Sequence, residues 1–410
     1  MKVSIEEIIE SLVITVSLSE IANNSTIREH MDGIKKKNTK DGYISHSKGT
    51  TFIALNIAKE MLLNEEDLKN LYIAAYLHDL GLTKVAFMEY DEATITREHC
   101  LEGARLISNI PKIENIAEYV KYHHENYDGT GPFGLVGEQI PLMSQILKIS
   151  DFIDSNYIEC RPEAYKWIMS ILTNDIDKYV SSKVGKAVIE VISKKTLWRG
   201  LNNSDFMDKW LETNKPIVEE SLDTYEFLQT AEVYAEIIDI RSSFTARHSR
   251  GISELAYLMA KYKGYDENKS IKLKIAGLLH DIGKLAVPIR YINKNGALTD
   301  IEYKLVKTHV FYTDLVLKPI KSIDDIREWA ISHHEKLDGT GYSRELNHNE
   351  LGEEQRLLAI CDIYQALAED RPYRRGLKRE KCLEIIGKMV ENNKLCPKAF
   401  EVLKSVTSNL

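Results

Sequence analysis

The stretch AGLLHDIGK, residues 276–284, and its near copy AAYLHDLGL, residues 74–82, decide how this chain folds. Each stretch belongs to a series of motifs that occurs once in each half of the chain, in the same order. In the first half the motifs contain His46, His78, Asp79, His99, His123, His124 and Asp151. In the second half they contain His248, His280, Asp281, His309, His333, His334 and Asp362. Such self-similarity indicates a duplicated structural unit.

The spacing of the motifs supports the duplication. His46 and His78 are 32 residues apart, as are His248 and His280, and the single histidine precedes the His-His pair by 24 residues in both halves. The separation between the His-Asp pair and the single histidine differs most, at 21 and 29 residues, and there we expect an inserted loop. We predict tandem domains at 36–195 and 226–410, a connection at 196–225, and a helical N-terminal segment at 1–35.

Apolar residues recur at three- and four-residue intervals through most of the chain. Ile252, Leu255 and Met259 follow His248 at this spacing, which predicts a helix after His248 and an imidazole directed into the core. Alternating runs of β-branched residues are scarce, so no large sheet is expected. The sequence predicts an all-α fold made of two tandem helical domains.

The composition restricts the classes of partner. The formal net charge is −8, from 54 basic and 62 acidic residues, which disfavours binding of a nucleic-acid polymer. The chain contains no apolar run long enough to span a membrane and begins with an acidic segment unlike a secretory signal, so a cytoplasmic location is expected. The five cysteines form no Cys-x-x-Cys pair, so neither disulfides nor a thiolate zinc site is indicated.

The repeated histidines and aspartates are candidate metal ligands. Ten of the twelve histidines belong to the repeat, and burying so many polar side chains on apolar helices without partners would be costly. Imidazole-rich sites suit iron, manganese, zinc or nickel better than calcium or magnesium. Five histidines and two aspartates per copy are too many ligands for one ion, so two divalent ions bridged by a carboxylate are expected. Two such ions would provide a bridging hydroxide to attack a phosphodiester.

Several neighbouring residues allow both a structural and a functional interpretation. Lys284 either complements the end of a helix or contacts a phosphate. The DGTG segments that follow each His-His pair, at 128–131 and 338–341, form tight turns that would lie at the rim of a site. A basic cluster at 371–375 is either a solvated turn or a binding site for phosphate and guanine edges.

Taken together, the second series resembles the HD-GYP branch of the HD phosphohydrolase superfamily. The resemblance is carried by HSRGI, LLHDIGK, the single His309, HHEKLDGTGY and CDIYQALAEDRPYRR, and it covers most of residues 230–390. It implies an all-helical fold, a centre of two or three iron or manganese ions, and hydrolysis of cyclic di-GMP or a related cyclic dinucleotide.

The resemblance also implies roles for individual residues. One ion would be held by His248, His280, Asp281 and Asp362, and Asp281 would bridge to a second ion held by His309, His333 and His334. The implied contacts to substrate are Lys284, Tyr342, Arg371 and Arg374, and Asp281 with Lys284 would form the catalytic pair. Phe244 stands where some members have an additional carboxylate ligand, which argues against a third ion.

Both copies depart from the family pattern. The second copy has Ser343 in place of the proline of Gly-Tyr-Pro and Gln365 where an aspartate is usual. The first copy keeps the ligand set but has Leu82 for the lysine, Pro132 for the tyrosine and Ala164 for the second arginine, with Arg161 retained. We therefore expect the second copy to be catalytic and the first to be regulatory, structural or altered in specificity.

Two other functions remain open from the sequence. One is hydrolysis of a different nucleotide, and the other is a metal-stabilised module that binds a cyclic nucleotide without turnover. A homodimer is compatible with the sequence as well.

Overall fold

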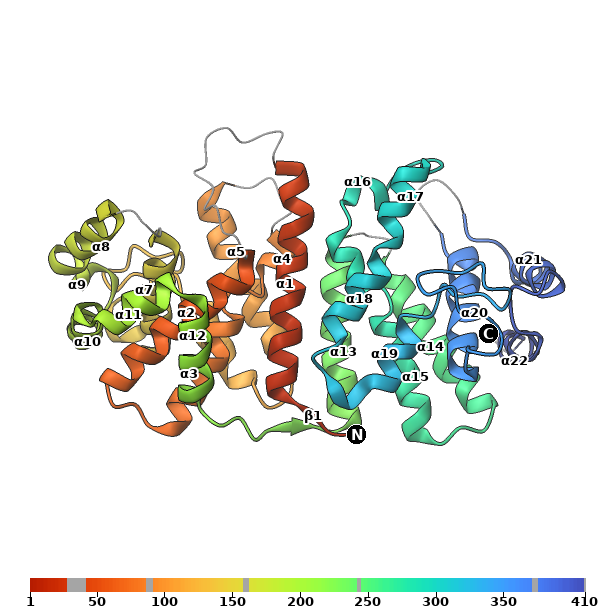
Figure 1. The fold of residues 1–410 in the computed structure, drawn as a ribbon, viewed down its shortest axis with the longest axis horizontal. Coiled ribbons are helices and arrows are strands. Elements are labelled where there is room, and N and C mark those ends of the chain that lie inside the picture. Colours follow the sequence, from red (N-terminus) through yellow and green to blue (C-terminus); the bar gives the residue numbers. More distant parts are fainter. Residues whose placement is uncertain (28–41, 86–90, 158–161, 242–244, 371–374, 409–410) are drawn as a thin grey trace. The chain divides into compact units, whose positions relative to one another are not determined.

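The computed structural model of the chain describes residues 1–27, 42–85, 91–157, 162–241, 245–370 and 375–408 (Figure 1). Helices dominate these residues. The strands they contain are β1 (Val3–Ser4) and β2 (Ser221–Leu222), which pair antiparallel with Val3 opposite Leu222. The prediction of an all-α fold without a large sheet is confirmed. Among the described residues, no helix is both long enough and apolar enough to cross a membrane.

The chain divides into two compact units. One comprises Met1–Ser11, Ile21–Arg28 and Ser221–Leu410, and it contains the second copy of the repeat. The other comprises Leu12–Glu20 and Glu29–Glu220, and it contains the first copy. Residues of α1 (Ile5–Ile27) are assigned to both units.

The helices of the first copy follow the order expected from its motifs. They are α2 (Gly42–Glu60), α3 (Glu65–Leu77), α4 (Leu82–Val85), α5 (Glu92–Ile107), η1 (Glu114–Ile116), α6 (Ala117–Lys121), η2 (Gly137–Gln139), α7 (Leu142–Asn156), α8 (Pro162–Asn174), α9 (Ile176–Tyr179) and α10 (Ser182–Ser193). The first histidine lies on α2, the His-Asp pair follows α3, the single histidine lies on α5, the His-His pair follows α6, and the last aspartate lies on α7.

The second copy repeats this order. Its helices are α13 (Thr224–Arg241), α14 (Thr245–Tyr262), α15 (Glu267–Leu279), η3 (Ile282–Ala286), α16 (Ile289–Ile292), α17 (Asp300–Lys307), α18 (His309–Leu317), η4 (Lys321–Ile323), α19 (Asp324–Ala330), α20 (Glu353–Ala368), α21 (Arg379–Glu391) and α22 (Pro397–Thr407). The motifs lie on or after α14, α15, α18, α19 and α20. Helix α14 begins before His248, so this histidine lies within the helix and not ahead of it as expected. The buried side chains of Ile252, Leu255 and Met259 nevertheless confirm the predicted inward face.

Matching caps fix where the His-Asp pair falls in each copy. The side chain of Asn64 accepts a hydrogen bond from the backbone N–H of Asp67 and starts α3, and Asp266 does the same for α15 through Lys269. Both helices have 13 residues, and the histidine of the pair is the residue that directly follows each helix. A side-chain cap at one end therefore sets the place of the ligands at the other.

A glycine after each His-Asp pair lets the next helix approach closely. A Cβ added to Gly81 would lie 2.0 Å from the carbonyl oxygen of His99, and one added to Gly283 would lie 2.0 Å from that of His309. No real side chain tolerates such a contact, so only glycine brings the single histidine beside the pair.

The eight additional residues of the second copy are not simply a loop. The segment between the His-Asp pair and His309 contains η3, α16 and α17. Helix α17 begins with a capping box, in which Thr299 and Glu302 exchange hydrogen bonds between side chain and backbone. The expectation of an inserted loop missed this cap.

The segments outside the two copies are also helical. Residues 196–225, expected as a connection, contain most of α11 (Lys195–Asn202) and all of α12 (Ser204–Asn214), and Trp210 of α12 packs against Phe52 of α2 with ring centroids 4.9 Å apart. In the N-terminal segment, Ser11 of α1 donates a hydrogen bond to the carbonyl of Val316 and accepts one from the hydroxyl of Tyr234.

Candidate metal centres

Each copy brings its histidines and aspartates into two neighbouring groups, and within a group one ligand atom from each residue lies within 4.8 Å of the others. The second copy has the groups His248, His280 and Asp281, and His309, His333 and His334. The first copy has the groups His46, His78 and Asp79, and His99, Cys100, His123 and His124. Two groups per copy match the number expected for a two-ion centre.

Asp281 lies between the two groups of the second copy. Its Oδ2 is 3.0 Å from His280 Nε2, and its Oδ1 is 3.5 Å from His309 Nε2 and 3.9 Å from His333 Nε2. Asp281 Oδ1 and His280 Nε2 are both buried and have no hydrogen-bond partner. Buried polar atoms normally have partners, and a cation would satisfy the carboxylate and the imidazole together. The residues therefore fit metal ions.

Asp362 on α20 completes the group around His248. Its Oδ1 is 3.3 Å from His248 Nε2, and its Oδ2 is 3.6 Å from His334 Nδ1. The Asp362 carboxylate therefore lies near one histidine of each group. All seven sequence-predicted ligands of the second copy thus converge.

Backbone carbonyls orient the buried imidazoles. His280 Nδ1 lies 2.8 Å from the carbonyl oxygen of Gly277, His309 Nδ1 lies 2.7 Å from that of Val306, and His333 Nδ1 lies 2.6 Å from that of Ala330. When Nδ1 carries the hydrogen and donates it, the lone pair is on Nε2, which faces the centre. The local helical turns thus present the nitrogen that a metal requires.

Burial sets the protonation states of the second centre. It lowers the pKa of His309 to about 3 and that of His334 to about 4. Burial would raise the pKa of Asp281, but His280 and Lys284 outweigh it and hold that pKa well below its usual value. Neutral imidazoles and ionised carboxylates are the forms that bind metals.

His248 is the exception in this centre. Burial lowers its pKa, but hydrogen bonds to the carboxylates of Asp362 and Glu369 outweigh burial and raise the pKa to about 9. An arriving metal ion would have to displace a proton from this side chain.

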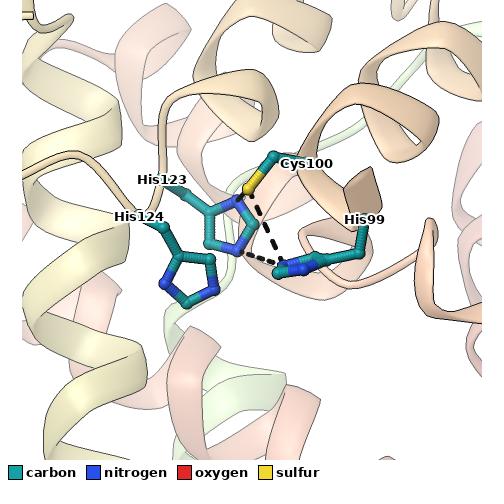
Figure 2. Close-up of side chains that lie close together, drawn as sticks. All are labelled: His99, Cys100, His123 and His124. Atoms are coloured by element: carbon teal, nitrogen blue, oxygen red, sulfur yellow. Dashed lines mark hydrogen bonds between the residues drawn. The ribbon is translucent and has the colours of Figure 1, made fainter. Parts of the chain in front are cut away.

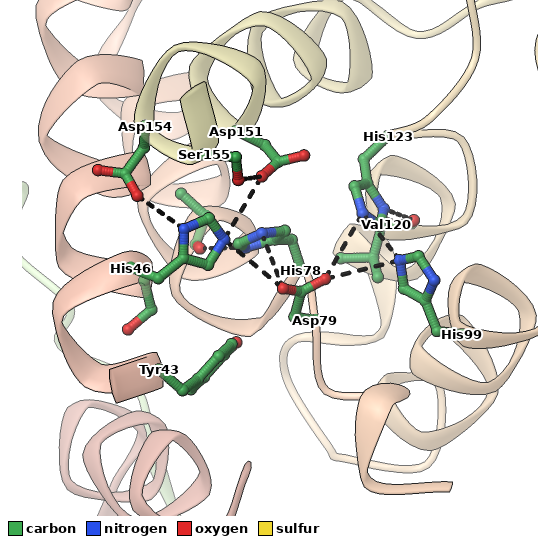
Figure 3. A network of polar contacts seen from close by, with 12 residues as sticks. Tyr43, His46, His78, Asp79, His99, Val120, His123, Asp151, Asp154 and Ser155 are labelled. Atoms are coloured by element: carbon green, nitrogen blue, oxygen red, sulfur yellow. Dashed lines mark hydrogen bonds and ion pairs between the residues drawn. The ribbon is translucent and has the colours of Figure 1, made fainter. Parts of the chain in front are cut away.

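The first copy builds the same arrangement around Asp79 (Figure 3). Asp79 Oδ2 is 3.4 Å from His78 Nε2 and 3.6 Å from His46 Nε2, whereas its Oδ1 is 3.6 Å from His99 Nε2. Asp151 Oδ1 lies 3.4 Å from His46 Nε2. His78 Nε2, like its counterpart in the second copy, is buried without a hydrogen-bond partner.

Cys100 is a residue of the first centre that the sequence reasoning missed (Figure 2). Its Sγ lies 3.8 Å from His99 Nε2 and 3.7 Å from His123 Nδ1, and the thiol is free and buried. Its position directly after the single histidine was visible in the sequence, but the absence of a Cys-x-x-Cys pair directed attention away from it. The counterpart in the second copy is Val310.

Each copy has a further carboxylate that holds its first histidine. In the first copy, Asp154 Oδ2 lies 2.7 Å from His46 Nδ1. In the second copy, Gln365 occupies the matching position, and Glu369 Oε2 lies 3.2 Å from His248 Nδ1 instead. Glu369 follows Gln365 by one helical turn, so both residues can reach the same neighbour. The missing aspartate is visible in the sequence, whereas its replacement by Glu369 is not.

A buried glutamate after each His-His pair holds the turn at the rim. Glu335 accepts hydrogen bonds from the backbone N–H groups of Arg344 (2.8 Å) and Leu346 (3.0 Å). Glu125 does the same for Phe133 (2.7 Å) and Leu135 (2.6 Å). The DGTG segments are turns, as expected, and these glutamates fix their approach to the centres.

Two of the predicted substrate contacts lie at the second centre. Lys284 Nζ is 2.5 Å from Asp281 Oδ2, and the ring centroid of Tyr342 is 4.6 Å from that of His334. In the first copy Leu82 and Pro132 offer neither charge nor hydroxyl at the corresponding positions. Arg371, Arg374, Arg161 and Phe244, which the sequence also singles out, lie outside the described residues.

Comparisons with known proteins agree with the fold and the motifs. Residues 23–155 and 232–398 match the family described as HD domain. The 3'3'-cGAMP-specific phosphodiesterase 1 of Vibrio cholerae serotype O1 is 26% identical over 374 residues, which cover 88% of this chain and 86% of that protein. The 3'3'-cGAMP-specific phosphodiesterase 3 of the same organism is 30% identical over 322 residues, covering 77% of this chain and 68% of the relative.

A solved structure extends the agreement in fold. The crystal structure of a cyclic GMP-AMP specific phosphodiesterase from V. cholerae superposes with a TM-score of 0.65 at 22% identity, covering 100% of this chain and 99% of the other. This likeness shows a common fold over the full length.

Proposed function

The chain belongs to the HD domain family, and we propose that it is a metal-dependent phosphodiesterase that hydrolyses a cyclic dinucleotide in its second copy. The first candidate substrate is 3'3'-cGAMP, because two relatives that align with most of the chain carry that specificity in their names. Cyclic di-GMP is the comparator substrate.

One observation carries this proposal: Asp281 turns one oxygen to each of two imidazole groups, and its Oδ1 is buried and has no hydrogen-bond partner. Such a carboxylate can bridge two cations, and two-ion centres are typical of phosphodiester hydrolysis. We propose that His248, His280, Asp281 and Asp362 hold one ion and that Asp281, His309, His333 and His334 hold the other. Iron or manganese suits this nitrogen and oxygen ligand set. Such ions would supply positive charge to the phosphate and an activated water.

The residues around the ions would bind and orient the substrate. Lys284, whose ammonium lies beside Asp281, would contact a non-bridging phosphate oxygen through a charge-assisted hydrogen bond. Tyr342, beside His334, presents an aromatic face and a hydroxyl to a base or phosphate. Arg371 and Arg374 are proposed as further contacts to phosphate or guanine edges.

Glu369 is proposed as a positioning residue for His248. Its carboxylate faces Nδ1 at 3.2 Å, so it would hold Nε2 towards Asp362 and make the imidazole a better electron donor. Asp154 would do the same for His46 in the first copy.

The first copy is proposed to be regulatory or structural. It keeps the ligand groups, but Leu82 and Pro132 leave it without the substrate contacts that Lys284 and Tyr342 would provide. A copy that binds metal and nucleotide without turnover is the second candidate for this half of the chain.

Paired substitutions test the assignment. Asp281→Ala and Asp79→Ala change equivalent residues, so each serves as the control for the other. Turnover of 3'3'-cGAMP, cyclic di-GMP and a nucleoside triphosphate is measured by the appearance of linear products, with metal content determined in parallel. We expect Asp281→Ala to abolish turnover and Asp79→Ala to retain it. Wild-type turnover in Asp281→Ala would refute the proposal, and hydrolysis of the triphosphate alone would identify another nucleotide phosphohydrolase.

A further inference from the structure

The two copies differ in the ligands of one imidazole group. In the first copy, one ligand atom from each of His99, Cys100, His123 and His124 lies within 4.8 Å of the others. In the second copy, His309, His333 and His334 form the group without a sulfur. The residue that matches Cys100 is Val310, which is 1% exposed and cannot bind a metal.

Two of the separations within this group are close to those between ligands of a single ion. His99 Nε2 and His123 Nε2 lie 3.3 Å apart, and Cys100 Sγ lies 3.8 Å from His99 Nε2. Ligands about 2.0–2.1 Å (nitrogen) and about 2.3 Å (sulfur) from a tetrahedral zinc ion are separated by roughly 3.3–3.6 Å. The imidazole pair already has this separation, and the sulfur is only a few tenths of an ångström beyond it. Cys100 Sγ faces His123 Nδ1 at 3.7 Å. To bind the same ion as His123 Nε2, the sulfur has to turn towards the Nε2 side of that imidazole.

The thiol changes what the group can do. In both copies an aspartate lies beside the imidazoles, Asp281 at 3.5 Å from His309 Nε2 and Asp79 at 3.6 Å from His99 Nε2, and only in the first copy does a cysteine add a further ligand. Structural zinc sites are filled by protein ligands, whereas catalytic sites keep a position open for water or substrate. A thiolate also favours zinc over manganese, because sulfur is a soft ligand.

We infer that His99, Cys100, His123 and His124 bind a zinc-type ion in a closed site, and that the two copies hold different metals. This inference rests on the part of the proposed function that places metals in the imidazole groups. When the metal–sulfur bond forms, the thiol of Cys100 releases its proton to solvent. Closure of this position explains how the first copy can keep its histidines and still be unable to admit water or substrate there.

Cobalt spectroscopy on the full chain tests the inference directly. The protein is stripped with a chelator and reloaded with Co²⁺, and the thiolate-to-cobalt charge-transfer absorption is recorded in the near ultraviolet. We expect the absorption in the wild type, its loss in Cys100→Val, and its retention in Cys361→Ala. Cys361 is the matched control because it is also buried, lies in the second copy, and contacts the sulfur of Met259.

Zinc retention provides the second measurement. After loading with equal zinc and manganese, Cys100→Val should lose one zinc per chain at chelator concentrations at least about tenfold lower than the wild type. Cys100→Ser, which is closer in size, replaces Cys100→Val if the latter does not fold. Absence of the charge-transfer band in cobalt-loaded wild type would overturn the inference, as would equal zinc retention in the variants. Cys100 would then be a buried thiol that packs as Val310 does.

The same protein separates this inference from the proposed function. Asp281→Ala should lose turnover of cyclic dinucleotide and keep the charge-transfer band. A band without turnover in the wild type would refute the phosphodiesterase alone, and turnover without a band would refute the closed zinc site alone.

Discussion

The carboxylate partner of His248 is Glu369, and not the residue at position 365, which matches Asp154 of the first copy. This contact leads to a quantitative prediction. Glu369→Gln keeps the size of the side chain and removes its charge. The contact joins Glu369 Oε2 to His248 Nδ1 at 3.2 Å, and the two side chains are 10% and 8% exposed, so solvent screens it little. Hydrogen bonds to charged groups contribute about 1.5–3 kcal/mol. Since about 1.4 kcal/mol corresponds to a factor of ten, metal affinity at His248 should fall by about 10- to 100-fold, with turnover falling in parallel at limiting metal.

A second substitution distinguishes positioning from general destabilisation. In the first copy, Asp154 lies against Gly49, where an added Cβ would come within 2.0 Å of its Oδ1. In the second copy, a Cβ added to Gly251 would likewise come within 2.3 Å of Gln365 Nε2. Gln365→Asp should therefore place a carboxylate beside His248 as Asp154 is beside His46, and Glu369→Gln combined with Gln365→Asp should recover most of the lost affinity.

Two measurements follow the loss of metal affinity in Glu369→Gln and its recovery by Gln365→Asp. The first is metal content after dialysis against graded chelator, and the second is kcat and KM at saturating and limiting manganese. Glu354→Gln, in the first turn of α20 and paired with Lys269, is the control and should change neither. The reasoning is refuted if Glu369→Gln retains metal and turnover within about twofold of the wild type, a change too small for a buried charge-assisted contact. Loss of thermal stability without rescue by Gln365→Asp would instead show that Glu369 supports the fold.

Three further predictions concern single side chains. His248 has its pKa raised to about 9, so its ion pairs stabilise the metal-free protein fully below its ordinary value near 6.5 and are lost as pH rises through 9. The melting temperature of the stripped protein should fall over that interval, and His248→Gln should flatten the change. Glu335 is 2% exposed, and its carboxylate accepts hydrogen bonds from two backbone N–H groups. Glu335→Gln removes the negative charge and should lower the free energy of unfolding by about 1–3 kcal/mol in denaturant titrations. Lys284→Met should lower kcat/KM by about 10- to 100-fold without loss of metal, from one charge-assisted phosphate contact, whereas Leu82→Met should leave turnover unchanged.

Much of the architecture could be predicted from the sequence because it depends on local periodicity and on order along the chain. Apolar spacing after His248 identified the buried face of α14, and the repeated order of motifs identified the duplicated arrangement of ligands. The place of Asp281 between two ligand groups was an expectation from the family resemblance, and in the structure Asp281 lies between the two imidazole groups.

The contacts that the sequence did not reveal depend on which residues meet across helices. Cys100 approaches His123 only because α5 lies against the turn after α6, and no spacing rule connects the two residues. Glu369 reaches His248 from 121 positions away along the chain. Glu335 is adjacent to a ligand, but its role depends on backbone N–H groups that lack a sequence signature. Helix α17 was missed for a different reason: the capping box of Thr299 and Glu302 is a local signal that the interpretation as a loop did not use.

The positions of the orienting carboxylates suggest how the two copies diverged. Asp154 follows Asp151 by three residues, and Glu369 follows Asp362 by seven, so the two carboxylates differ by four residues, or about one helical turn. Positions three and seven residues after a ligand lie on the same face of a helix, so either can supply the partner of the first histidine. The longer side chain of Glu369 compensates for its greater distance along the axis. A substitution that removes the partner at one position is therefore tolerated when a carboxylate is present one turn later.

The buried ligands themselves do not have such freedom. His78 and His280 are fully buried, and their Nε2 atoms face Asp79 at 3.4 Å and Asp281 at 3.0 Å, so replacing that aspartate would leave a polar atom without any partner in the core, at a cost of about 1–3 kcal/mol each. Lys284, Tyr342 and their counterparts Leu82 and Pro132 are all half-buried, so exchanging them leaves no fully buried polar atom without a partner. A copy released from catalysis would thus lose its substrate contacts first and keep its metal ligands, which is the pattern of the first copy.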